Sequence, residues 1–237
     1  MKIKEAKYKQ IEDFFIAQIE QGELKYGDQI MTEAQLCQKF SSSRMTVNKA
    51  MNHLSEKGYI TRIPGKGSFV QAPAVAKDSV STDSFTEDMR KIGMKAGSKL
   101  LTYQALKASD VPEVRDKLNL NNDDLVHYIV RLRSGNGMPV AISYGYVSAR
   151  VVPAIDIESL NQSFYEYLDT IGIPRVAKTM QFSARLPNEE QKKLLGISET
   201  ALLCVSHITY TEIRNEIVPF EYIENYYNGD LYTYTSR

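Results

Sequence analysis

The chain has 237 residues, of which 43% are hydrophobic and 24% are charged, and its 29 basic side chains balance its 29 acidic ones. This composition is enough to bury a core, in one large domain or in two modest ones. The sequence contains no run of about 18 apolar residues, which excludes a membrane-spanning helix. No apolar run follows the charges of the first five residues, so we expect no signal peptide and a cytoplasmic protein.

The two cysteines and the three histidines show no ligand spacing. Cys37 and Cys204 lie far apart, and the histidines are scattered along the chain. We therefore expect both cysteines to be small buried hydrophobic residues in a reducing compartment. We expect neither a metal site nor a cofactor.

The first forty residues predict two helices. A stripe of apolar residues four positions apart predicts a helix over residues 6–21; its members are Ile11, Phe15 and Ile19. Thr32 begins a short second helix, because its hydroxyl and the side chain of Gln35 form a capping box.

A serine run separates the second helix from a third. Ser43 is a suitable N-cap for the third helix, and Gly58 ends it. The predicted inner face of this helix consists of Met45, Val47, Ala50, Met51 and Leu54. Two short strands, at residues 59–63 and 68–70, flank a glycine-rich turn at residues 64–67. Together these elements predict a winged helix-turn-helix.

The charge is distributed unevenly along the neutral chain. Between Lys39 and Lys66 there are six cations and one anion, Glu56. A local cationic surface of this kind suits a protein that contacts a polyanion with one end only. On charge alone, a solvated basic helix face explains the pattern equally well.

The order of elements favours contact with double-stranded DNA. A helix that follows a tight turn presents its first residues to base edges in the major groove. There Arg44 can donate two parallel hydrogen bonds to guanine, and Asn48 lies one turn later on the same face. In the wing, Lys66 is flanked by two glycines that allow close backbone approach to DNA, and its side chain can enter the minor groove. The candidate DNA-binding residues are Thr32, Glu33, Ser43, Arg44, Thr46, Asn48, Lys49, Gly65, Lys66 and Gly67. Each of them alone would more often be an ordinary surface or turn residue.

The composition changes at residues 72–83, which we interpret as a linker between a domain at residues 1–71 and another at residues 84–237. In the second domain, strands such as 99–107, 124–134, 138–148, 201–213 and 217–227 alternate with short helices at 84–92, 111–118, 163–171 and 188–195. Ser134-Gly135-Asn136-Gly137 is a strong hairpin turn. Adjacent hairpins predict an antiparallel sheet and an α+β fold.

The first half resembles the winged-helix domain of the GntR family of bacterial transcriptional regulators, from Tyr8 to Val70. The resemblance is carried by Gln10-Ile11, Gly22-Glu23-Leu24, Gly27-Asp28, Thr32-Glu33, Leu36, Phe40, Ser43-Arg44-Met45-Thr46-Val47, Ala50, Leu54, Gly58-Tyr59-Ile60 and Gly65-Lys66-Gly67-Ser68-Phe69-Val70. Two positions depart from the family, which often has arginines in contact with DNA where this chain has Ala34 and Asn48. The resemblance therefore implies DNA binding with a different operator or weaker phosphate contacts.

The second half is similar to the UTRA domain, the effector-binding domain of the HutC subfamily. The similar segments are Ser84-Phe85-Thr86-Glu87-Asp88-Met89, Gly97-Ser98-Lys99-Leu100-Leu101, Arg131-Leu132-Arg133, Met138-Pro139-Val140-Ala141, Ser163-Phe164-Tyr165, Phe220-Glu221 and Tyr227-Asn228-Gly229-Asp230. The resemblance implies a chorismate-lyase-like fold without enzyme activity, a homodimer formed through this domain, and a small-molecule effector that is often a phosphorylated sugar.

Two arginines in this half favour an anionic effector. Arg131 and Arg133 are two residues apart on a strand, so both point to one face. A phosphate or a carboxylate suits their fork geometry, although pairing with protein carboxylates is the alternative. The resemblance adds further positions, so the candidate effector-binding residues are Phe85, Thr86, Arg131, Arg133, Ser143, Ser163, Tyr165, Glu221 and Tyr227. Sugar-binding relatives commonly carry Glu where this chain has Ser143, so the effector need not be a sugar.

The main hypothesis is a repressor whose affinity for double-stranded operator DNA depends on a small anionic metabolite, with the change transmitted through the linker. One alternative is a chorismate-lyase-like enzyme in which Arg131 or Arg133 binds a carboxylate and Glu221 acts as an acid. The sequence carries no catalytic triad, metal cluster or nucleotide loop in favour of an enzyme. A ligand-independent DNA-binding protein is the third hypothesis.

Overall fold

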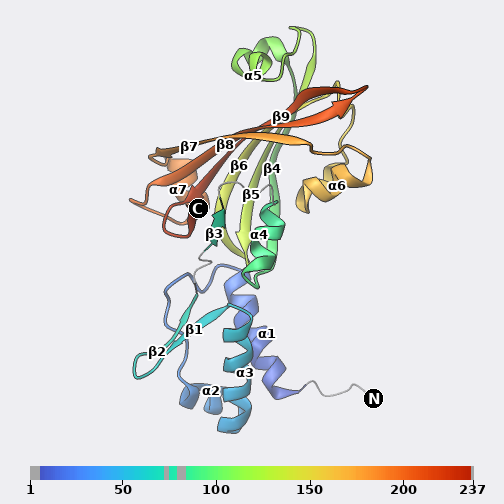
Figure 1. Cartoon of the computed structure of the whole chain (residues 1–237). Helices are drawn as coiled ribbons and strands as arrows, with labels where there is room; N and C mark the ends of the chain where they lie inside the picture. The colour runs from blue at the N-terminus through green and yellow to red at the C-terminus, as the bar shows by residue number, and fades with distance from the viewer. Residues whose placement is uncertain (1–5, 72–74, 79–83, 236–237) are drawn as a thin grey trace.

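The computed structural model describes residues 6–71, 75–78 and 84–235, which form two halves placed end to end (Figure 1). The N-terminal half contains three helices and a two-stranded sheet. The C-terminal half contains a six-stranded sheet with helices on both faces. This arrangement confirms the predicted α+β class.

The N-terminal half has the winged helix-turn-helix order that the sequence predicts. Its elements are α1 (Lys7–Glu20), α2 (Glu33–Phe40), α3 (Arg44–Glu56), β1 (Ile60–Ile63) and β2 (Gly67–Val70). The side chain of Thr32 caps α2 through a complete capping box with Gln35, and the hydroxyl of Ser43 accepts a hydrogen bond from the backbone N–H of Thr46 at 3.3 Å. Strands β1 and β2 pair in antiparallel fashion as the wing.

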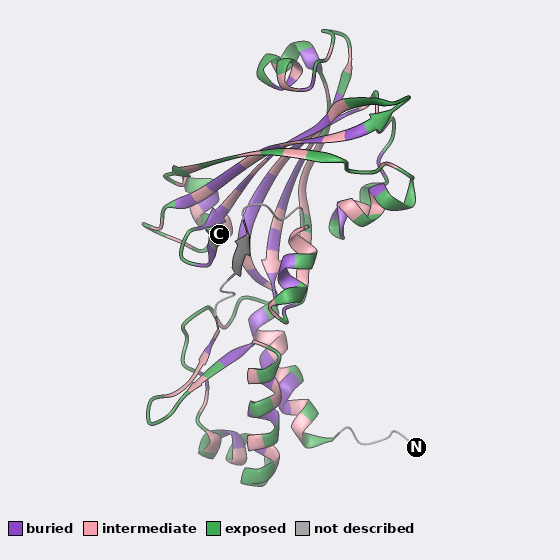
Figure 2. Ribbon diagram, viewed as in Figure 1, coloured by how far each residue is buried: buried purple, intermediate pink, exposed green. Residues whose placement is uncertain are grey.

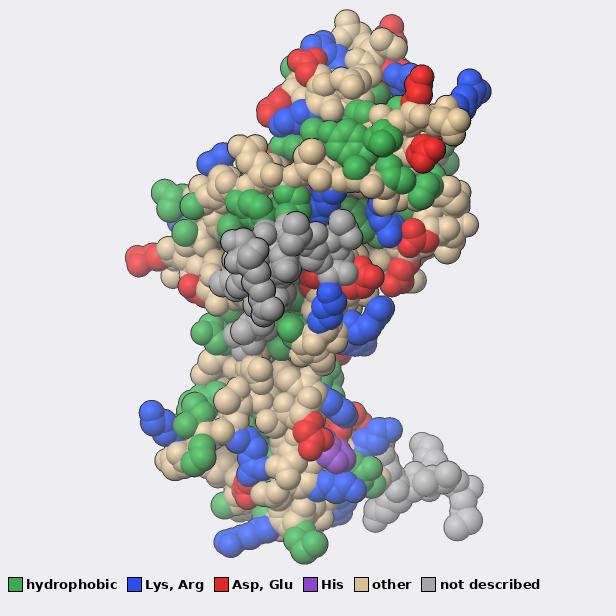
Figure 3. All heavy atoms as spheres, in the orientation of Figure 1, with side chains coloured by type: hydrophobic (Ala, Val, Ile, Leu, Met, Phe, Trp, Pro, Cys, Tyr) green, Lys and Arg blue, Asp and Glu red, His purple; other side chains and the backbone are tan. Residues whose placement is uncertain are grey.

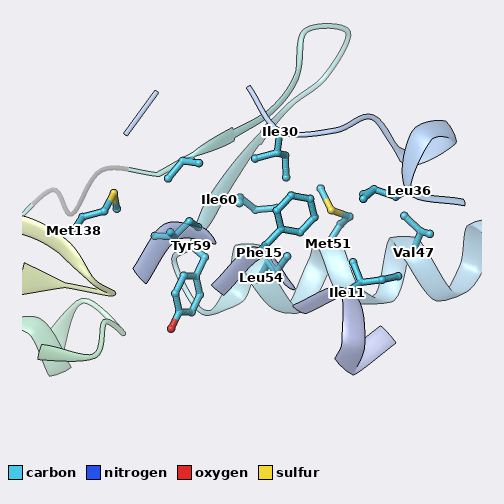
Figure 4. Close-up of a cluster of buried hydrophobic side chains, with 13 residues drawn as sticks. Ile11, Phe15, Ile30, Leu36, Val47, Met51, Leu54, Tyr59, Ile60 and Met138 are labelled. Carbon is cyan, nitrogen blue, oxygen red and sulfur yellow. The ribbon is translucent and has the colours of Figure 1, made fainter. Parts of the chain in front are cut away.

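The core of this half is a single apolar cluster between the helices and the wing. Ile11, Phe15 and Ile19 of α1 are buried against Val47, Met51 and Leu54 of α3 and against Ile60 of β1 (Figure 4). The buried side chains come from elements before and after the turn between α2 and α3. The core therefore fixes the orientation of α3 and the side that it exposes to solvent.

The prediction that Met45 lies on the inner face of α3 is wrong, since its side chain is 84% exposed. The buried residues of α3 are Val47, Ala50, Met51 and Leu54, at a spacing of three and four residues. Met45 precedes Val47 by two residues, which places the two on opposite sides of a helix with 3.6 residues per turn.

The six-stranded sheet of the C-terminal half is antiparallel throughout, in the order β4-β5-β6-β9-β8-β7. Its strands are β4 (Ala96–Lys107), β5 (Leu125–Gly135), β6 (Met138–Ser148), β7 (Ala177–Arg185), β8 (Leu202–Ile213) and β9 (Glu216–Asn228). The sequence predicts both hairpins, β5–β6 and β8–β9. It does not predict β7, an edge strand whose residues are mostly exposed and alternate weakly.

Helices pack on both faces of this sheet, and Figure 2 shows buried residues along its central strands. The helical elements are α4 (Phe85–Lys91), η1 (Ala108–Asp110), α5 (Pro112–Lys117), η2 (Ile157–Asn161), α6 (Phe164–Thr170) and α7 (Glu189–Leu195). Helices α4 and α6 pack on the face that carries Ala141 and Val147, whereas α5 and α7 pack on the opposite face. None of the helices in the described ranges combines the length and the apolar character needed to cross a membrane.

Four residues of the segment interpreted as a linker form a strand instead. Strand β3 (Val75–Asp78) pairs in parallel with β10 (Tyr232–Thr235) near the end of the chain. A parallel pair of four residues with distant partners leaves no local sequence period, so the composition of residues 72–83 did not reveal it.

Candidate functional site

The outward side of α3 is a polar stripe at the tip of the N-terminal half. Arg44, Lys49 and Asn52 are exposed on it, and Asn48 is half-buried. Two of the candidate DNA-binding residues, Arg44 and Lys49, are therefore accessible on the surface. On the face seen in Figure 3, Lys and Arg side chains are scattered over this half, with a few Asp and Glu side chains between them.

A hydrogen-bonded network joins α2, α3 and the wing beside this stripe. Arg62 of β1 forms an ion pair with Glu33, with 2.5 Å between Nη2 and Oε1, and it also donates to Asn52. Asn48 donates to the same Glu33 oxygen at 3.3 Å and accepts from Asn52 at 3.1 Å. The network places the side chain of Arg62, a residue absent from the predicted site, next to Asn48, the α3 position at which the family resemblance implies an arginine.

The wing forms a groove of about 500 Å³ with the start of α2, lined by Thr32, Glu33, Arg62 and the turn glycines among others. Gly65 has φ +74° and open space around it, so its conformation alone requires glycine. Gly67 has φ +120°, and a Cβ there would lie 2.5 Å from Nε2 of Gln29, which donates to the Lys66 carbonyl at 3.0 Å. Gly67 thus allows the segment before α2 to hold the wing tip.

A second polar site lies inside the C-terminal half, between the sheet and helices α4 and α6. A cavity of about 60 Å³ brings together seven of the nine predicted effector-binding residues. These are Phe85, Arg131, Arg133, Ser143, Ser163, Tyr165 and Tyr227, with Ser84, Phe164, His207, Ile223 and Asn225 as additional lining residues. Thr86 does not line it, and Glu221 lies behind Tyr165. The volume is several times the 10–15 Å³ that one water needs, yet well below the roughly 300 Å³ of a typical ligand pocket.

Two arginines of β5 dominate the electrostatics of this cavity. Arg131 and Arg133 are only 7% and 6% exposed. Burial lowers the pKa of Arg131, and burial together with repulsion from Arg131 lowers the pKa of Arg133 to about 9. Within the described part of the chain, Nη1 of Arg131 and Nε of Arg133 have no hydrogen-bond partner. Buried donors of this kind are costly unless an acceptor satisfies them.

The guanidinium groups are held in place by aromatic rings. Arg133 lies over the ring of Phe85 at 4.6 Å, and Arg131 lies 5.7 Å from the ring centroid of Phe164. Both rings come from the first residues of helices, α4 and α6. The two helices therefore fix the arginines against the sheet.

A network of hydrogen bonds holds the hydroxyl group of Tyr165 at one side of the cavity. Its hydroxyl donates to buried Glu221 at 2.8 Å, and Thr209 donates to the same carboxylate oxygen at 2.7 Å. His207 lies 3.2 Å from the Tyr165 hydroxyl. Burial and the nearby Glu221 raise the pKa of Tyr165 well above its ordinary value, so the phenol stays protonated. Ser143, on the other side, donates to Asn225 at 2.5 Å.

Sequence reasoning missed His207, which lies on a strand without a predicted site residue, and Asn225, although it lies two residues before Tyr227 on β9 and so faces the same side of the strand. Register supplies the signal in the structure: Asn225 pairs with Ser143, and it also pairs with Val205, two residues before His207. Alternation along β8 and β9 then directs both side chains to the face of Arg131 and Arg133.

Family comparisons agree with both halves. Residues 7–70 match the gntR family of bacterial regulatory proteins, and residues 91–233 match the UTRA domain. The chain is 30% identical over 231 residues to the HTH-type transcriptional repressor NagR of Bacillus subtilis (strain 168), which covers 96% of this chain and 92% of NagR. The chain belongs to the gntR family of bacterial regulatory proteins.

Other relatives and solved structures extend this assignment. The mannosyl-D-glycerate transport/metabolism system repressor MngR of Escherichia coli (strain K12) is 28% identical over 229 residues, 96% of this chain and 94% of MngR. PhnF from Mycobacterium smegmatis shares the fold over 97% of both chains, with a TM-score of 0.62 at 21% identity. YydK from Bacillus subtilis shares it over 98% of both chains, with a TM-score of 0.59 at 24% identity.

Regulators of this family bind operator DNA through the winged-helix domain and an effector through the UTRA domain. The two sites described above lie in those two domains. The chain is therefore a transcription regulator with a DNA-binding half and an effector half.

Proposed function

We propose that this regulator is a repressor whose affinity for its operator is controlled by a small anionic metabolite, such as a phosphorylated sugar. The observation that carries this proposal is the pair of buried arginines with unused donors, Arg131 and Arg133. A phosphate or a carboxylate offers several acceptor oxygens to such donors and neutralises the repulsion between the two cations.

The relatives support a sugar-derived effector. MngR is named as a repressor of mannosyl-D-glycerate transport and metabolism, and a relative from Shigella flexneri is named as a probable repressor of a fructoselysine utilization operon. Ser143 and Asn225 offer small neutral groups beside the arginines, which suits an anionic head group more than a ring with many hydroxyls. Because the cavity holds only about 60 Å³, a sugar phosphate requires α4 or α6 to move outward.

On the DNA side, we propose that Arg44 reads a base in the major groove, while Thr32, Ser43, Thr46 and Lys49 contact phosphates. Glu33 holds Asn48 and Arg62 in place beside them. Gly65, Lys66 and Gly67 form a wing tip that reaches the neighbouring minor groove.

Selection from a random DNA library by the full chain, followed by gel shifts with a panel of hexose phosphates, tests the proposal. We expect one hexose phosphate to change the affinity for the selected DNA by 5–150-fold, corresponding to a coupling of about 1–3 kcal/mol. The chain with Arg133→Met should bind the DNA equally well and show no response. If no member of the panel binds or alters DNA affinity, the anionic effector is contradicted.

We also propose a homodimer, since two winged helices must be held about one helical turn of DNA apart to bind a two-fold operator. The sheet face between α5 and α7 carries Tyr128, Tyr144, Tyr146 and Tyr226, and tyrosine is enriched at the centres of interfaces. Light scattering should give twice the chain mass for the wild type and one chain mass for Tyr144→Glu. A wild-type monomer at micromolar concentration would contradict the dimer.

A further inference from the structure

The tip of the β5–β6 hairpin enters the N-terminal half of the molecule. Met138, the first residue of β6, is 6% exposed and belongs to the same apolar cluster as the winged-helix residues Ile11 and Phe15. Figure 4 shows Met138 extending from the strands of the effector half towards Tyr59 and the rest of that core. One effector-domain side chain thus completes the packing of the DNA-binding domain.

Asn136 forms the polar part of the same contact and is 1% exposed. Its side-chain oxygen accepts from the backbone N–H of Lys95 at 2.8 Å, and its own backbone N–H donates to the Lys95 carbonyl at 2.8 Å. Its amide nitrogen donates to the carbonyl of Lys57, the C-cap residue of α3, at 3.4 Å. Asn136 therefore ties the end of the reading helix to the effector sheet.

Gly137 packs closely against the end of α1. It adopts φ +81°, and a Cβ at this position would lie 2.5 Å from Cα of Glu20, the last residue of α1. Because the obstacle is backbone, a side chain here would force the two domains apart. The contact is possible only with glycine.

The strands that end at this tip also carry the anion site. Arg133 precedes Asn136 by three residues, about 10 Å along an extended strand, and Ser143 follows Met138 by five on the partner strand. We propose that Asn136, Gly137 and Met138 are positioning residues through which an anion bound at Arg131 and Arg133 sets the placement of the winged-helix domain. The β5–β6 hairpin, rather than the linker expected from the sequence, would then transmit effector binding to the DNA-binding half. The chemical nature of the ligand rests on the proposed function.

The mechanism follows from the charges on β5. An anion between the two guanidinium groups removes their mutual repulsion and holds them in one arrangement. The β5–β6 hairpin becomes more rigid as a result, and its tip holds the ends of α1 and α3 more firmly. The docked arrangement is therefore the one that the anion stabilises.

Hydrogen exchange on the full chain, with inorganic phosphate as the probe, tests this coupling. In the wild type, saturating phosphate should slow exchange at least threefold around residues 19–22 and 57–58. Gly137→Ala should raise exchange there at least tenfold without phosphate and abolish the response to it. The matched control is Gly172→Ala, because Gly172 has φ +74° and nothing within 4 Å of its Cβ position. Equal effects of the two variants would overturn the proposal.

Two methionine variants distinguish a loss of the contact between the halves from a general loss of folding. Met138→Ala should raise exchange in the winged-helix core, whereas Met89→Ala, fully buried inside the effector half, should leave that core unchanged. Phosphate binding measured by calorimetry separates the two proposals. Absence of binding to the wild type contradicts the anion site, while binding that leaves residues 19–22 and 57–58 unaffected overturns the hairpin coupling alone.

A separate observation concerns base recognition. Met45 is 84% exposed at the start of α3, on the same stripe as Asn48, Lys49 and Asn52. A large apolar side chain beside Arg44 thus stands almost entirely in water. In the major groove, the matching apolar group is the C5-methyl of thymine. We infer that Met45 is a specificity-determining residue that contacts a thymine methyl group, an inference that rests on α3 reading DNA.

Replacement of single thymines by deoxyuridine in the selected DNA removes one methyl group at a time. We expect the wild type to lose three- to tenfold in affinity at one or two positions, and Met45→Ala to show no such loss there. Leu186→Ala, equally exposed at 84% but in the effector half, should behave as the wild type. Indifference of the wild type to every substitution, or a loss retained by Met45→Ala, would overturn the inference. If Arg44→Ala also binds as the wild type does, α3 is not the reading helix and the proposed function fails.

Discussion

The two halves of this molecule place their arginines in opposite environments. Arg44 stands in water at the start of α3, free to adapt to a polyanion, whereas Arg131 and Arg133 are buried, fixed by aromatic rings and partly without hydrogen-bond partners. An exposed cation costs little to maintain and loses its effect in salt. A buried cation destabilises the free protein and binds its ligand strongly. On the proposed function, the exposed arginine can therefore adapt to the DNA surface, while the buried pair is prepared for one small anion.

The largest expected effect comes from removing a buried charge. Arg133→Met should weaken hexose-phosphate binding by about 100-fold, because truncating one partner of a buried charged hydrogen bond costs roughly 2–5 kcal/mol. The same change should raise the melting temperature of the ligand-free chain, since a buried cation without a full set of partners is replaced by an apolar side chain. Calorimetry and thermal unfolding measure the two effects.

Arg150→Met is the matched control for that experiment. Its side chain is 56% exposed, pairs with Asp124 at 3.6 Å and does not line the cavity. It should change neither the affinity nor the melting temperature appreciably. A ligand-free Arg133→Met chain that melts lower than the wild type would contradict the contrast between buried and exposed arginines.

An exposed arginine gives the next effect. Arg44→Ala should reduce the affinity for the selected DNA by roughly 5–150-fold, because a bidentate contact to guanine is worth about 1–3 kcal/mol, and it should relax the preference at one base pair. Fluorescence anisotropy against single-base variants of the site measures both. The melting temperature should stay unchanged, in contrast to Arg133→Met. A uniform loss over all variants would show a phosphate contact instead.

The pH dependence of effector binding follows from the lowered pKa of Arg133, about 9. Below this pH the guanidinium is charged and attracts the anion, and above it the charge is lost, so affinity should fall up to tenfold per pH unit as the pH rises through about 9. Calorimetry between pH 7 and pH 10 checks the slope. Arg133→Met should show a flatter profile, and an unchanged profile would refute the role of this group.

The smallest effect concerns the network beside the reading helix. Glu33→Gln removes an anion from the DNA-facing side and releases Arg62, so DNA affinity should rise about threefold at low salt and the salt dependence should steepen. Glu56→Gln, further along α3, is the control and should have less effect. Weaker DNA binding by Glu33→Gln would contradict this prediction and would show that the positioning of Asn48 and Arg62 by Glu33 outweighs the repulsion of its charge.

Sequence patterns predicted most of the fold because its signals are local. The capping residues Thr32 and Ser43 and the turn at Asn136-Gly137 specify their elements from a few neighbouring residues. The missed features depend on partners far away in the chain. Strand β3 exists through its pairing with β10, and β7 is an edge strand with weak alternation.

The site residues, too, divide into those with a local sequence signal and those that depend on distant partners. The spacing of Arg131 and Arg133 placed both on one face of a strand, and the structure brings them together with five more of the predicted residues. Arg62 and His207 enter the two sites only through tertiary contacts and strand register, whereas the alternation of Asn225 with Tyr227 along one strand was a local signal that went unused. The prediction that Met45 lies on the inner face was wrong because it was based on the hydrophobic side chain and not on the position of residue 45 around the helix.

The pairing of β3 with β10 also limits how far the DNA-binding domain can travel. It anchors the chain to the effector half at Val75, so only four residues separate this anchor from the end of the wing at Val70. Fully extended, that tether spans at most about 18 Å. A winged-helix domain released from the hairpin therefore remains at a local concentration in the millimolar range or above, and weak contacts at the hairpin tip suffice to recapture it.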